Sequence, residues 1–513
     1  MASFLITECL EKIFLNFLDI PAGDTSTNSS TINTSTNTST GDLYACTLVS
    51  RYWCKVSTPL LYSYPFHHFR NLTYRDDDVK SKILDHYFKL IHTLLKCIPH
   101  DIEQTLNEPY LAMHFHLSTF NYISFIRGLI FHDVIFHCHR QDWFTYLGLE
   151  TTSVDFFSLM VLFTKFLCKH CNNLTILEFP FKIEVSLFDD MIELLSPKLD
   201  NLKELYYHGK SCHGLPLKSC YSNIPMHFYS KLDNIRSINL LCSDIVEAIS
   251  LSKFIPLQNR LQHFILSDYH SAANSNNGKY NIVINSLSAQ KDSLQVLELR
   301  NVSFKNVDGK AIDLLGLLKN IRKLKLFWCR QFNIKLNSWT RNLPKIEEFE
   351  FIGFYIEDMS ISFIIKLIQS ASLTLTRLVI DYDRVDAFDY NVTQIYDQIP
   401  LYLHSLTHLT LTQIRQTELV PIFTSCIKLV YLSIIPIGKI EGYLENVIPK
   451  RLQIIQFRKV DFINIDTLGP SLKKCVNDGG KLKYLEIKGR CNVSQECFDL
   501  VGKLGVKLII YRA

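Results

Sequence analysis

Residues 293–326 read SLQVLELRNVSFKNVDGKAIDLLGLLKNIRKLKL and contain one short pattern twice. The pattern is a polar residue followed by Leu-x-x-Leu-x-Leu or a close variant, and it begins at Leu294 and again at Ile321. Apolar residues at every second position predict a β-strand with one buried face, because successive side chains of a strand point to opposite sides. Ten further copies begin at Leu174, Leu202, Ile235, Leu261, Ile346, Leu375, Leu406, Leu429, Leu452 and Leu482.

The spacing of these copies is typical of a repeat array. Successive copies begin 23 to 33 residues apart, and common leucine-rich repeats span about 20–29 residues and tolerate insertions. Between the predicted strands, apolar residues recur at helical spacing, as they do in one face of an amphipathic helix. Three such segments are Ile361, Ile364, Ile365 and Ile368; Val392, Ile395, Tyr396 and Ile399; and Cys497, Leu500, Val501 and Leu504.

A strand followed by a helix in every repeat predicts an α/β repeat solenoid, a leucine-rich-repeat horseshoe with a parallel concave sheet, over residues 166–513. The alternative is a doubly wound βαβ domain, which predicts a Gly-rich phosphate-binding turn. The chain contains no G-x-G-x-x-G motif, which favours the solenoid. The third and fifth positions of each pattern should face the concave surface, so we expect a weak substrate-binding role for Glu204, Tyr206, Lys323, Lys325, Glu348, Glu350 and Arg377. The alternative for these residues is a solvated face of alternating charge.

The first 62 residues predict a small helical module with an insert. Residues 24–41 are almost all Ser, Thr and Asn, a composition that buries too little apolar surface to order the chain. Thr7 should cap a helix before the insert, and Asp42 should cap a second helix after it. A third helical segment covers residues 52–56, and Pro59 should end it. Residues 63–165 read as a linking region of mixed helix and strand, and the alternative is that they form degenerate first repeats.

The residues of this module resemble the F-box motif. The resemblance is carried by Leu5-Ile6, Cys9-Leu10, Ile13-Phe14, Leu18, Asp42-Leu43, Cys46, Leu48-Val49-Ser50 and Tyr52-Trp53, with Pro59-Leu60-Leu61-Tyr62 resembling the tail of the motif. The motif usually opens with Leu-Pro, whereas Ile6 stands in place of that proline, and the insert splits the first inter-helix loop. The order of F-box and leucine-rich repeats is similar to that of the F-box/LRR proteins, particularly large fungal families of them.

This resemblance implies the substrate-recognition subunit of an SCF-type ubiquitin ligase. The F-box would dock on a Skp-type adaptor, which links to cullin and RING subunits, and the repeats would bind a protein substrate for ubiquitin-dependent catabolism. The alternative is a protein-interaction scaffold with a decayed F-box and no role in ubiquitination, which Ile6 and the insert favour modestly. The expected adaptor-binding residues are Leu5, Ile6, Ile13, Phe14, Leu18, Leu43, Leu48, Val49 and Trp53. The alternative for some of them is that they fill the helical core.

Composition excludes other classes of protein. Lys and Arg number 54 and Asp and Glu 50, which gives a net charge of +4, too weak and too dispersed to predict nucleic-acid binding. No uncharged apolar run approaches the 18 or so residues that span a membrane, and Glu8, Glu11 and Lys12 interrupt the N-terminal apolar stretch, so we expect no membrane association and no signal peptide. The 15 cysteines then read as reduced thiols of a cytoplasmic or nuclear protein.

Possible sites for chemistry are few. Cys168 and Cys171 have the CxxC spacing of zinc ligands, but no second CxxC accompanies them, so buried core thiols are the favoured interpretation. His114, His116, His137 and His139 form two His-x-His pairs without a carboxylate partner. No nucleophile elbow, P-loop or kinase signature occurs. We therefore expect no metal, no cofactor, no catalytic residue and no enzymatic activity.

Overall fold

A computed structural model covers residues 1–513. The structure describes residue 10 and the ranges 44–69, 77–97, 120–130, 156–179, 185–207, 232–242, 245–268, 278–354, 356–382, 392–437, 447–458, 469–488 and 495–511. The insert 24–41 lies outside the described residues, as do the expected adaptor-binding residues Leu5, Ile6, Ile13, Phe14, Leu18 and Leu43. The chain divides into two compact units, residues 1–238 and 239–513. The boundaries that we expect after residues 62 and 165 remain predictions.

The first unit contains a short helical segment next to a small apolar core. Residues 44–47 are helical, and helix α3 spans Arg51–Leu61. Ser50 caps this helix, because its Oγ accepts a hydrogen bond of 3.1 Å from the backbone N–H of Trp53 and so satisfies one of the free donors of the first turn.

Leu10, Val56 and Leu60 form that core, and Trp53 packs against it. The expectation that Pro59 ends the third helix is wrong, because α3 continues through Pro59 to its end. A proline removes one backbone hydrogen bond from a helix, whereas Leu60 beside it is only 2% exposed. Burial of the apolar side chain offsets the lost bond at this position near the helix end.

The rest of the first unit alternates helices with short strands. The elements are η2 (His67–Phe69), α4 (Asp77–Leu95), η4 (Tyr122–Phe125), β1 (Gly128–Ile130), α8 (Phe156–His170), β2 (Ile176–Phe179), α9 (Val185–Leu195), η5 (Ser196–Asn201) and β3 (Glu204–Tyr207). Strands β1, β2 and β3 pair in parallel, with Leu129 opposite Leu177 and Leu177 opposite Leu205. A strand that the sequence pattern did not predict, β1, therefore precedes the first predicted one.

The second unit repeats a strand and a helix along its length. Strand β4 (Ser237–Leu241) crosses the boundary between the units. The following elements are α11 (Ile245–Phe254), η6 (Ile255–Leu257), β5 (His263–Ser267), α12 (Lys279–Leu287), η7 (Ser288–Gln290), β6 (Val296–Arg300), α13 (Gly309–Leu315), β7 (Lys323–Phe327), α14 (Leu336–Thr340), β8 (Glu348–Gly353), α15 (Asp358–Ser370), β9 (Arg377–Tyr382), α16 (Thr393–Tyr402), β10 (His408–Ile414), α17 (Gln416–Ser425), β11 (Tyr431–Pro436), β12 (Ile454–Arg458), α18 (Gly469–Asn477), β13 (Tyr484–Lys488), α19 (Gln495–Lys503) and β14 (Lys507–Tyr511).

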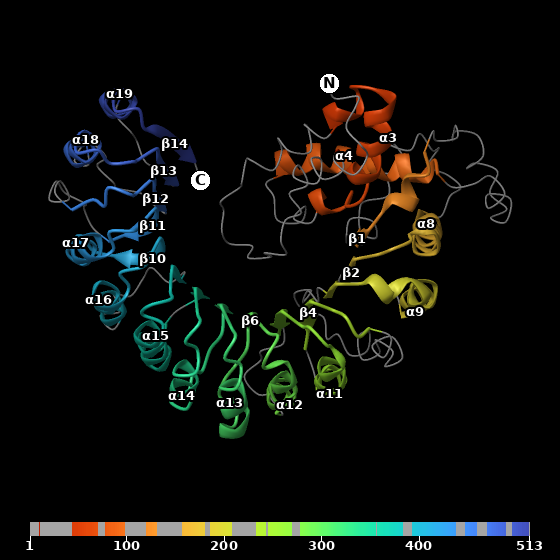
Figure 1. Cartoon of the computed structure of the whole chain (residues 1–513), viewed down its shortest axis with the longest axis horizontal. Coiled ribbons are helices and arrows are strands. Elements are labelled where there is room, and N and C mark those ends of the chain that lie inside the picture. The colour runs from red at the N-terminus through yellow and green to blue at the C-terminus, as the bar shows by residue number, and fades with distance from the viewer. Residues whose placement is uncertain are drawn as a thin grey trace. The chain divides into compact units, whose positions relative to one another are not determined.

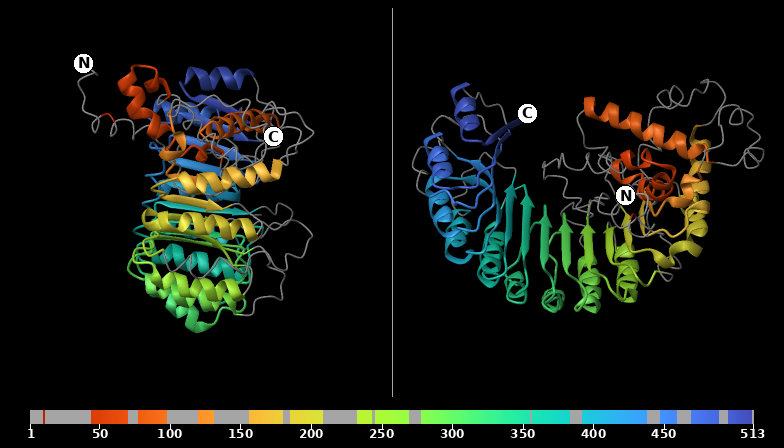
Figure 2. Two further views of the ribbon diagram at one scale, coloured as in Figure 1. Left: turned by 90° about the vertical axis from the view of Figure 1, so that its right-hand side faces the viewer. Right: turned by 45° about the horizontal axis from the view of Figure 1, so that its top comes forward.

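Strand order confirms the predicted repeat solenoid. The hydrogen-bonded order runs from β1 to β14 exactly as the strands follow in the chain, in one 14-stranded sheet, and the second unit's strands pair in parallel, as β7 does with β8. A doubly wound domain would reverse its strand order at a switch point. In the second unit, helices α11 to α17 lie on one and the same side of the sheet (Figures 1 and 2).

The buried face of each strand follows the sequence pattern. All twelve predicted copies form strands, each of which begins two residues after the first apolar residue of its pattern. In the repeat of β10, for example, Leu406 just before the strand and Leu409 and Leu411 within it are 0% exposed. The predicted helices are confirmed as well, since Ile361, Ile364 and Ile368 are buried on α15. Each coil thus buries its apolar face against its neighbours, as a solenoid requires.

Candidate protein-binding surfaces

The described part of the N-terminal module carries an exposed apolar surface. Tyr44, Leu48, Val49 and Tyr52 are 58%, 71%, 61% and 37% exposed, and we call them the N-terminal apolar surface. Leu48 and Val49 follow the helical residues 44–47 in a turn that hydrogen bonds from their N–H groups to Ala45 and Cys46 hold in place. Because exposed apolar side chains forgo the stabilisation of burial, several of them on a small module mark a candidate contact surface.

Of the expected adaptor-binding residues, the structure describes three. Leu48 and Val49 belong to the N-terminal apolar surface. Trp53 packs against the core of Leu10, Val56 and Leu60. Its contacts therefore fit the alternative, in which it fills the helical core. The adaptor-binding role of all nine remains a prediction.

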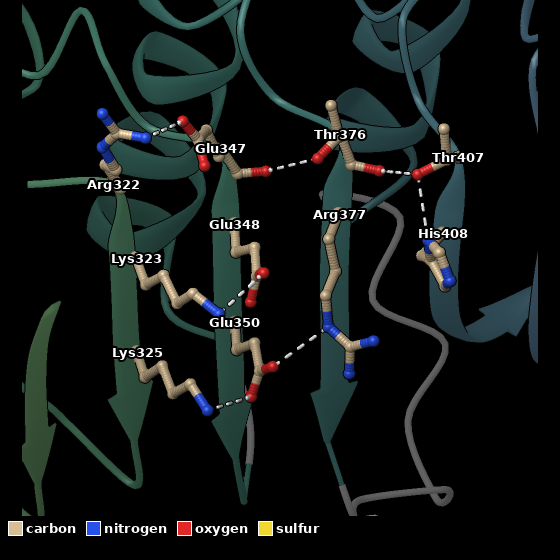
Figure 3. A network of polar contacts seen from close by, with 10 residues as sticks. All are labelled: Arg322, Lys323, Lys325, Glu347, Glu348, Glu350, Thr376, Arg377, Thr407 and His408. Carbon is tan, nitrogen blue, oxygen red and sulfur yellow. Dashed lines mark hydrogen bonds and ion pairs between the residues drawn. The ribbon is translucent and has the colours of Figure 1, made fainter. Parts of the chain in front are cut away.

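The second unit carries a charged ladder on strands β6 to β9. It comprises Glu298, Arg300, Lys323, Lys325, Glu348, Glu350 and Arg377, all of them at the third, fifth or seventh position of the repeat pattern. The sheet register places Lys323 opposite Glu348 and Lys325 opposite Glu350, and Glu348 opposite Arg377. Figure 3 shows five of these side chains pointing across neighbouring strands toward one another.

The fifth-position row of the ladder is buried, so the alternative of a solvated face does not hold for Lys325 and Glu350. Glu298, Lys325 and Glu350 are 1%, 3% and 5% exposed. Lys325 Nζ lies 3.9 Å from Glu350 Oε2, and Glu298 pairs with Arg300. Burial raises the pKa of Glu298, even though Arg300 and Lys325 act to lower it. Strands lie only about 4.8 Å apart, so long side chains in one row shield one another from water.

The third-position row is more accessible. Lys323 Nζ lies 2.9 Å from Glu348 Oε1, with side chains 42% and 26% exposed. Arg377 is 35% exposed and places its Nε 3.2 Å from Glu350 Oε1. The ladder therefore has two partly exposed cations, Lys323 and Arg377, next to the buried fifth-position row, whose charges are already paired.

His408 on β10 extends this row beyond Arg377. Its Nδ1 lies 2.9 Å from Thr407 Oγ1, a contact drawn in Figure 3. Its ring stacks on Tyr431 with centroids 5.9 Å apart. Burial, followed by the charge of Arg377, lowers the pKa of His408.

The remaining expected substrate-binding residues, Glu204 and Tyr206, lie on β3 in the first unit. The Tyr206 hydroxyl donates to Glu204 Oε2 over 2.8 Å, and Tyr206 is only 1% exposed. These two residues contact each other, and both occupy concave-facing positions of β3. The substrate-binding role of the seven residues remains a prediction.

Sequence reasoning missed part of the polar surface. Glu298 occupies the fifth position of the pattern LQVLEL, so the rule that found Lys325 and Glu350 also identifies it. A second polar network joins strands β9 and β12, where Arg458 Nη1 lies 2.6 Å from Asp381 Oδ2. Both residues stand at the seventh position, which the six-residue pattern does not cover.

The cysteine pair is buried, as we expected. Cys168 and Cys171 are 0% exposed, and burial raises the pKa of both thiols, that of Cys171 to about 12. Lys198 donates to the Cys168 carbonyl over 3.0 Å and so stabilises the end of α8. His114, His116, His137 and His139 lie outside the described residues.

Neither a metal-binding cluster nor a membrane-spanning helix occurs among the described residues. They contain no group of three or more His, Cys, Asp and Glu side chains placed to hold a metal ion. No helix among them is both long enough and apolar enough to cross a bilayer.

Comparisons with known proteins give no family. No family model matches the chain, and no curated protein matches it in sequence. Similar solved structures include a structural-genomics target from Bacteroides fragilis, 12% identical with a TM-score of 0.32, which covers 55% of this chain and 75% of that one. Another is a chain of the Rad7 and Elc1 complex from yeast, 16% identical with a TM-score of 0.36, which covers 68% of this chain and 72% of that one.

Proposed function

We propose that this chain is a protein-binding adaptor of an SCF-type ubiquitin ligase. In this proposal the N-terminal module docks a Skp-type adaptor, which links it to cullin and RING subunits, and the repeats hold a protein substrate. The chain itself performs no chemistry, since other subunits of such a ligase transfer ubiquitin. We place its action in the cytoplasm or nucleus.

The N-terminal apolar surface is the observation that carries the proposal. Leu48 and Val49 are more than half exposed, whereas Val56 and Leu60 a few residues later are buried. The module thus has a filled core and a separate apolar face. These residues also lie within the stretch that resembles the F-box, and partner surfaces of small modules are apolar at their centre.

The repeat sheet supports the second half of the proposal. A parallel sheet in which each strand contributes its third and fifth side chains forms a continuous platform for another protein. The charged ladder gives part of this platform fixed ion pairs and two partly exposed cations, Lys323 and Arg377. Such an arrangement can orient a partner by charge without catalysing a reaction.

The test is co-purification of the full chain with a purified Skp-type adaptor and its cullin. The variant Leu48→Ser with Val49→Ser removes the exposed apolar atoms without touching the core, so we expect it to lose the adaptor while the chain stays folded. Trp53→Ala is a poorer probe because Trp53 packs on the core. The matched control is Leu373→Ser with Leu401→Ser, since these residues of the repeats are 88% and 63% exposed.

Two results would contradict the proposal. Full adaptor binding by the Leu48/Val49 variant would exclude the assigned surface. Failure of the unaltered chain to retain both adaptor and cullin would favour the alternative, a repeat scaffold without a role in ubiquitination.

A further inference from the structure

One turn geometry recurs in the second unit. At the eighth position of the repeat pattern, Asn301 and Trp328, directly after β6 and β7, and Gln413, at a register irregularity inside β10, have φ angles of 56°, 53° and 58°. These values lie in the left-handed region, which side chains other than glycine rarely adopt. The eighth positions of β8 and β9, Gly353 and Tyr382, do not adopt this geometry, so it belongs to particular repeats and not to the repeat fold as such.

Tryptophan is a poor residue for this turn. Asn tolerates the left-handed region because its short amide can bond to the nearby backbone, whereas a bulky side chain is strained there. Trp328 is nevertheless held in place by a backbone hydrogen bond of 2.5 Å from its N–H to the Ile352 carbonyl. Strain of this kind concentrates at functional sites, where a side chain is needed for something other than stability.

The ring of Trp328 has an exposed aromatic neighbour. Trp328 is half-buried, and its ring centroid lies 6.4 Å from that of Phe354, which is 60% exposed at the end of β8. Phe327, whose ring centroid lies 6.1 Å from that of Trp328, is buried. Two accessible rings over a buried one form a rigid apolar anchor point of the kind that dominates protein interfaces.

The loops that follow β6 and β7 are basic, whereas Glu357 and Asp358 follow Phe354 after β8. Residues 301–308 and 328–335 contain Lys305, Arg330 and Lys335 against the single acid Asp308, and Lys310 lies in the first turn of α13. Asp308 is engaged as a helix cap, since its Oδ1 accepts from the Ala311 N–H over 2.7 Å. The charge that these loops present to a partner is therefore positive, on the β6 side of the two rings.

We propose that Trp328 and Phe354 anchor an apolar side chain of a protein partner, and that the basic loops beside them bind acidic residues flanking that side chain. The ligand is an extended acidic peptide segment with one aromatic or large aliphatic residue. This inference rests on the proposed role of the repeats in holding a protein substrate, and it assigns that substrate a chemistry and a place on the chain.

The test is selection from a randomised twelve-residue phage-displayed peptide library on the full chain. We expect enriched peptides to combine an aromatic or large aliphatic residue with several Asp or Glu residues. Synthetic copies should bind about 30-fold more weakly to Phe354→Ser and to Trp328→Asn. In Trp328→Asn, relief of backbone strain offsets lost ring contacts, so its Tm should stay within about 4 °C of the unaltered chain. Arg330→Glu should weaken acidic peptides and spare a copy whose acids are replaced by Lys.

Leu373→Ser is the matched control, because it removes an exposed leucine remote in sequence from these loops and should leave peptide binding unchanged. The inference is overturned if no peptide is enriched, if the enriched peptides lack acids, or if Phe354→Ser binds them fully. Peptide selection needs no Skp-type adaptor, and adaptor binding needs neither Trp328 nor Phe354. Loss of one with retention of the other therefore separates this inference from the proposed function.

Discussion

The repeat strands and the N-terminal helical segment use apolar residues in opposite ways. Leu406, Leu409 and Leu411 on and before β10 are fully buried, whereas Leu48 and Val49 are largely exposed. A strand of the solenoid has a neighbouring coil on each side to cover it. The helical segment has a core of few residues and cannot cover every apolar side chain that it carries. The spacing of apolar residues therefore predicts which side of an element is apolar. Whether that side is buried within the chain depends on the elements packed beside it.

The largest expected effect comes from the core of the repeats. Phe349→Ala on β8 removes a side chain that is 0% exposed, and such cavities cost about 3–5 kcal/mol. Leu48→Ala should change the free energy of unfolding by about 0.5 kcal/mol or less, because its site is already solvated. Urea denaturation of both variants measures the contrast. Equal losses would mean that the N-terminal apolar surface is part of a core.

The next effect compares two ion pairs on the same two strands. Glu350→Ala removes the carboxylate that lies 3.9 Å from the buried Lys325 and leaves Glu298 opposite it on β6, which should cost about 2 kcal/mol. The double variant Lys325→Met with Glu350→Leu should recover most of that loss, because apolar groups need no partner. Urea midpoints give both values, and a double variant as unstable as the single one would contradict this account of the buried row.

The exposed pair should matter far less. Lys323→Ala removes the contact with Glu348, whose members are 42% and 26% exposed, and we expect a loss of about 0.5 kcal/mol. The loss should shrink further in high salt, since solvent ions screen exposed charges. A loss as large as that of Glu350→Ala would show that the two rows are equally buried.

The smallest effect concerns pH. The pKa of His408 is lowered from its ordinary value of 6.5 by burial and then by Arg377, so the folded chain binds this proton less readily than the unfolded chain does. The stability that neutral His408 contributes is therefore present above pH 6.5 and is lost as the pH falls below it. His408→Gln should reduce the fall in Tm between about pH 7 and pH 5. The exposed His404 offers a control, and an unchanged pH profile in His408→Gln would refute the assignment.

The sequence pattern located twelve strands and missed two for identifiable reasons. In the repeat of β1, Ile126-Arg127-Gly128-Leu129 fits the pattern, but an apolar residue, Phe125, precedes it where the other copies have a polar one. Before β14, Gly505 replaces the first apolar residue and adopts a φ of +71°. A pattern built on side chains cannot find a repeat whose first position is chosen for its backbone.

For the candidate binding residues, the sequence predicted which face of the sheet they occupy but not how exposed they are. The period of the strands placed Lys325 and Glu350 opposite each other, yet it gave no sign that both would be buried, because shielding depends on the neighbouring strands. Trp328 escaped notice for a related reason, since the sequence pattern does not reveal its left-handed backbone. In the N-terminal module, Trp53 shows that resemblance to a motif does not separate a core aromatic from a contact residue.

Hydrogen–deuterium exchange of the full chain, with and without a purified Skp-type adaptor, tests most directly whether the N-terminal module, and not the repeats, binds the adaptor. The account predicts that the adaptor slows exchange in residues 44–61, where the N-terminal apolar surface lies, and leaves strands β5 to β14 unchanged. Slower exchange in those strands with none in residues 44–61, or no slowing anywhere, would contradict it.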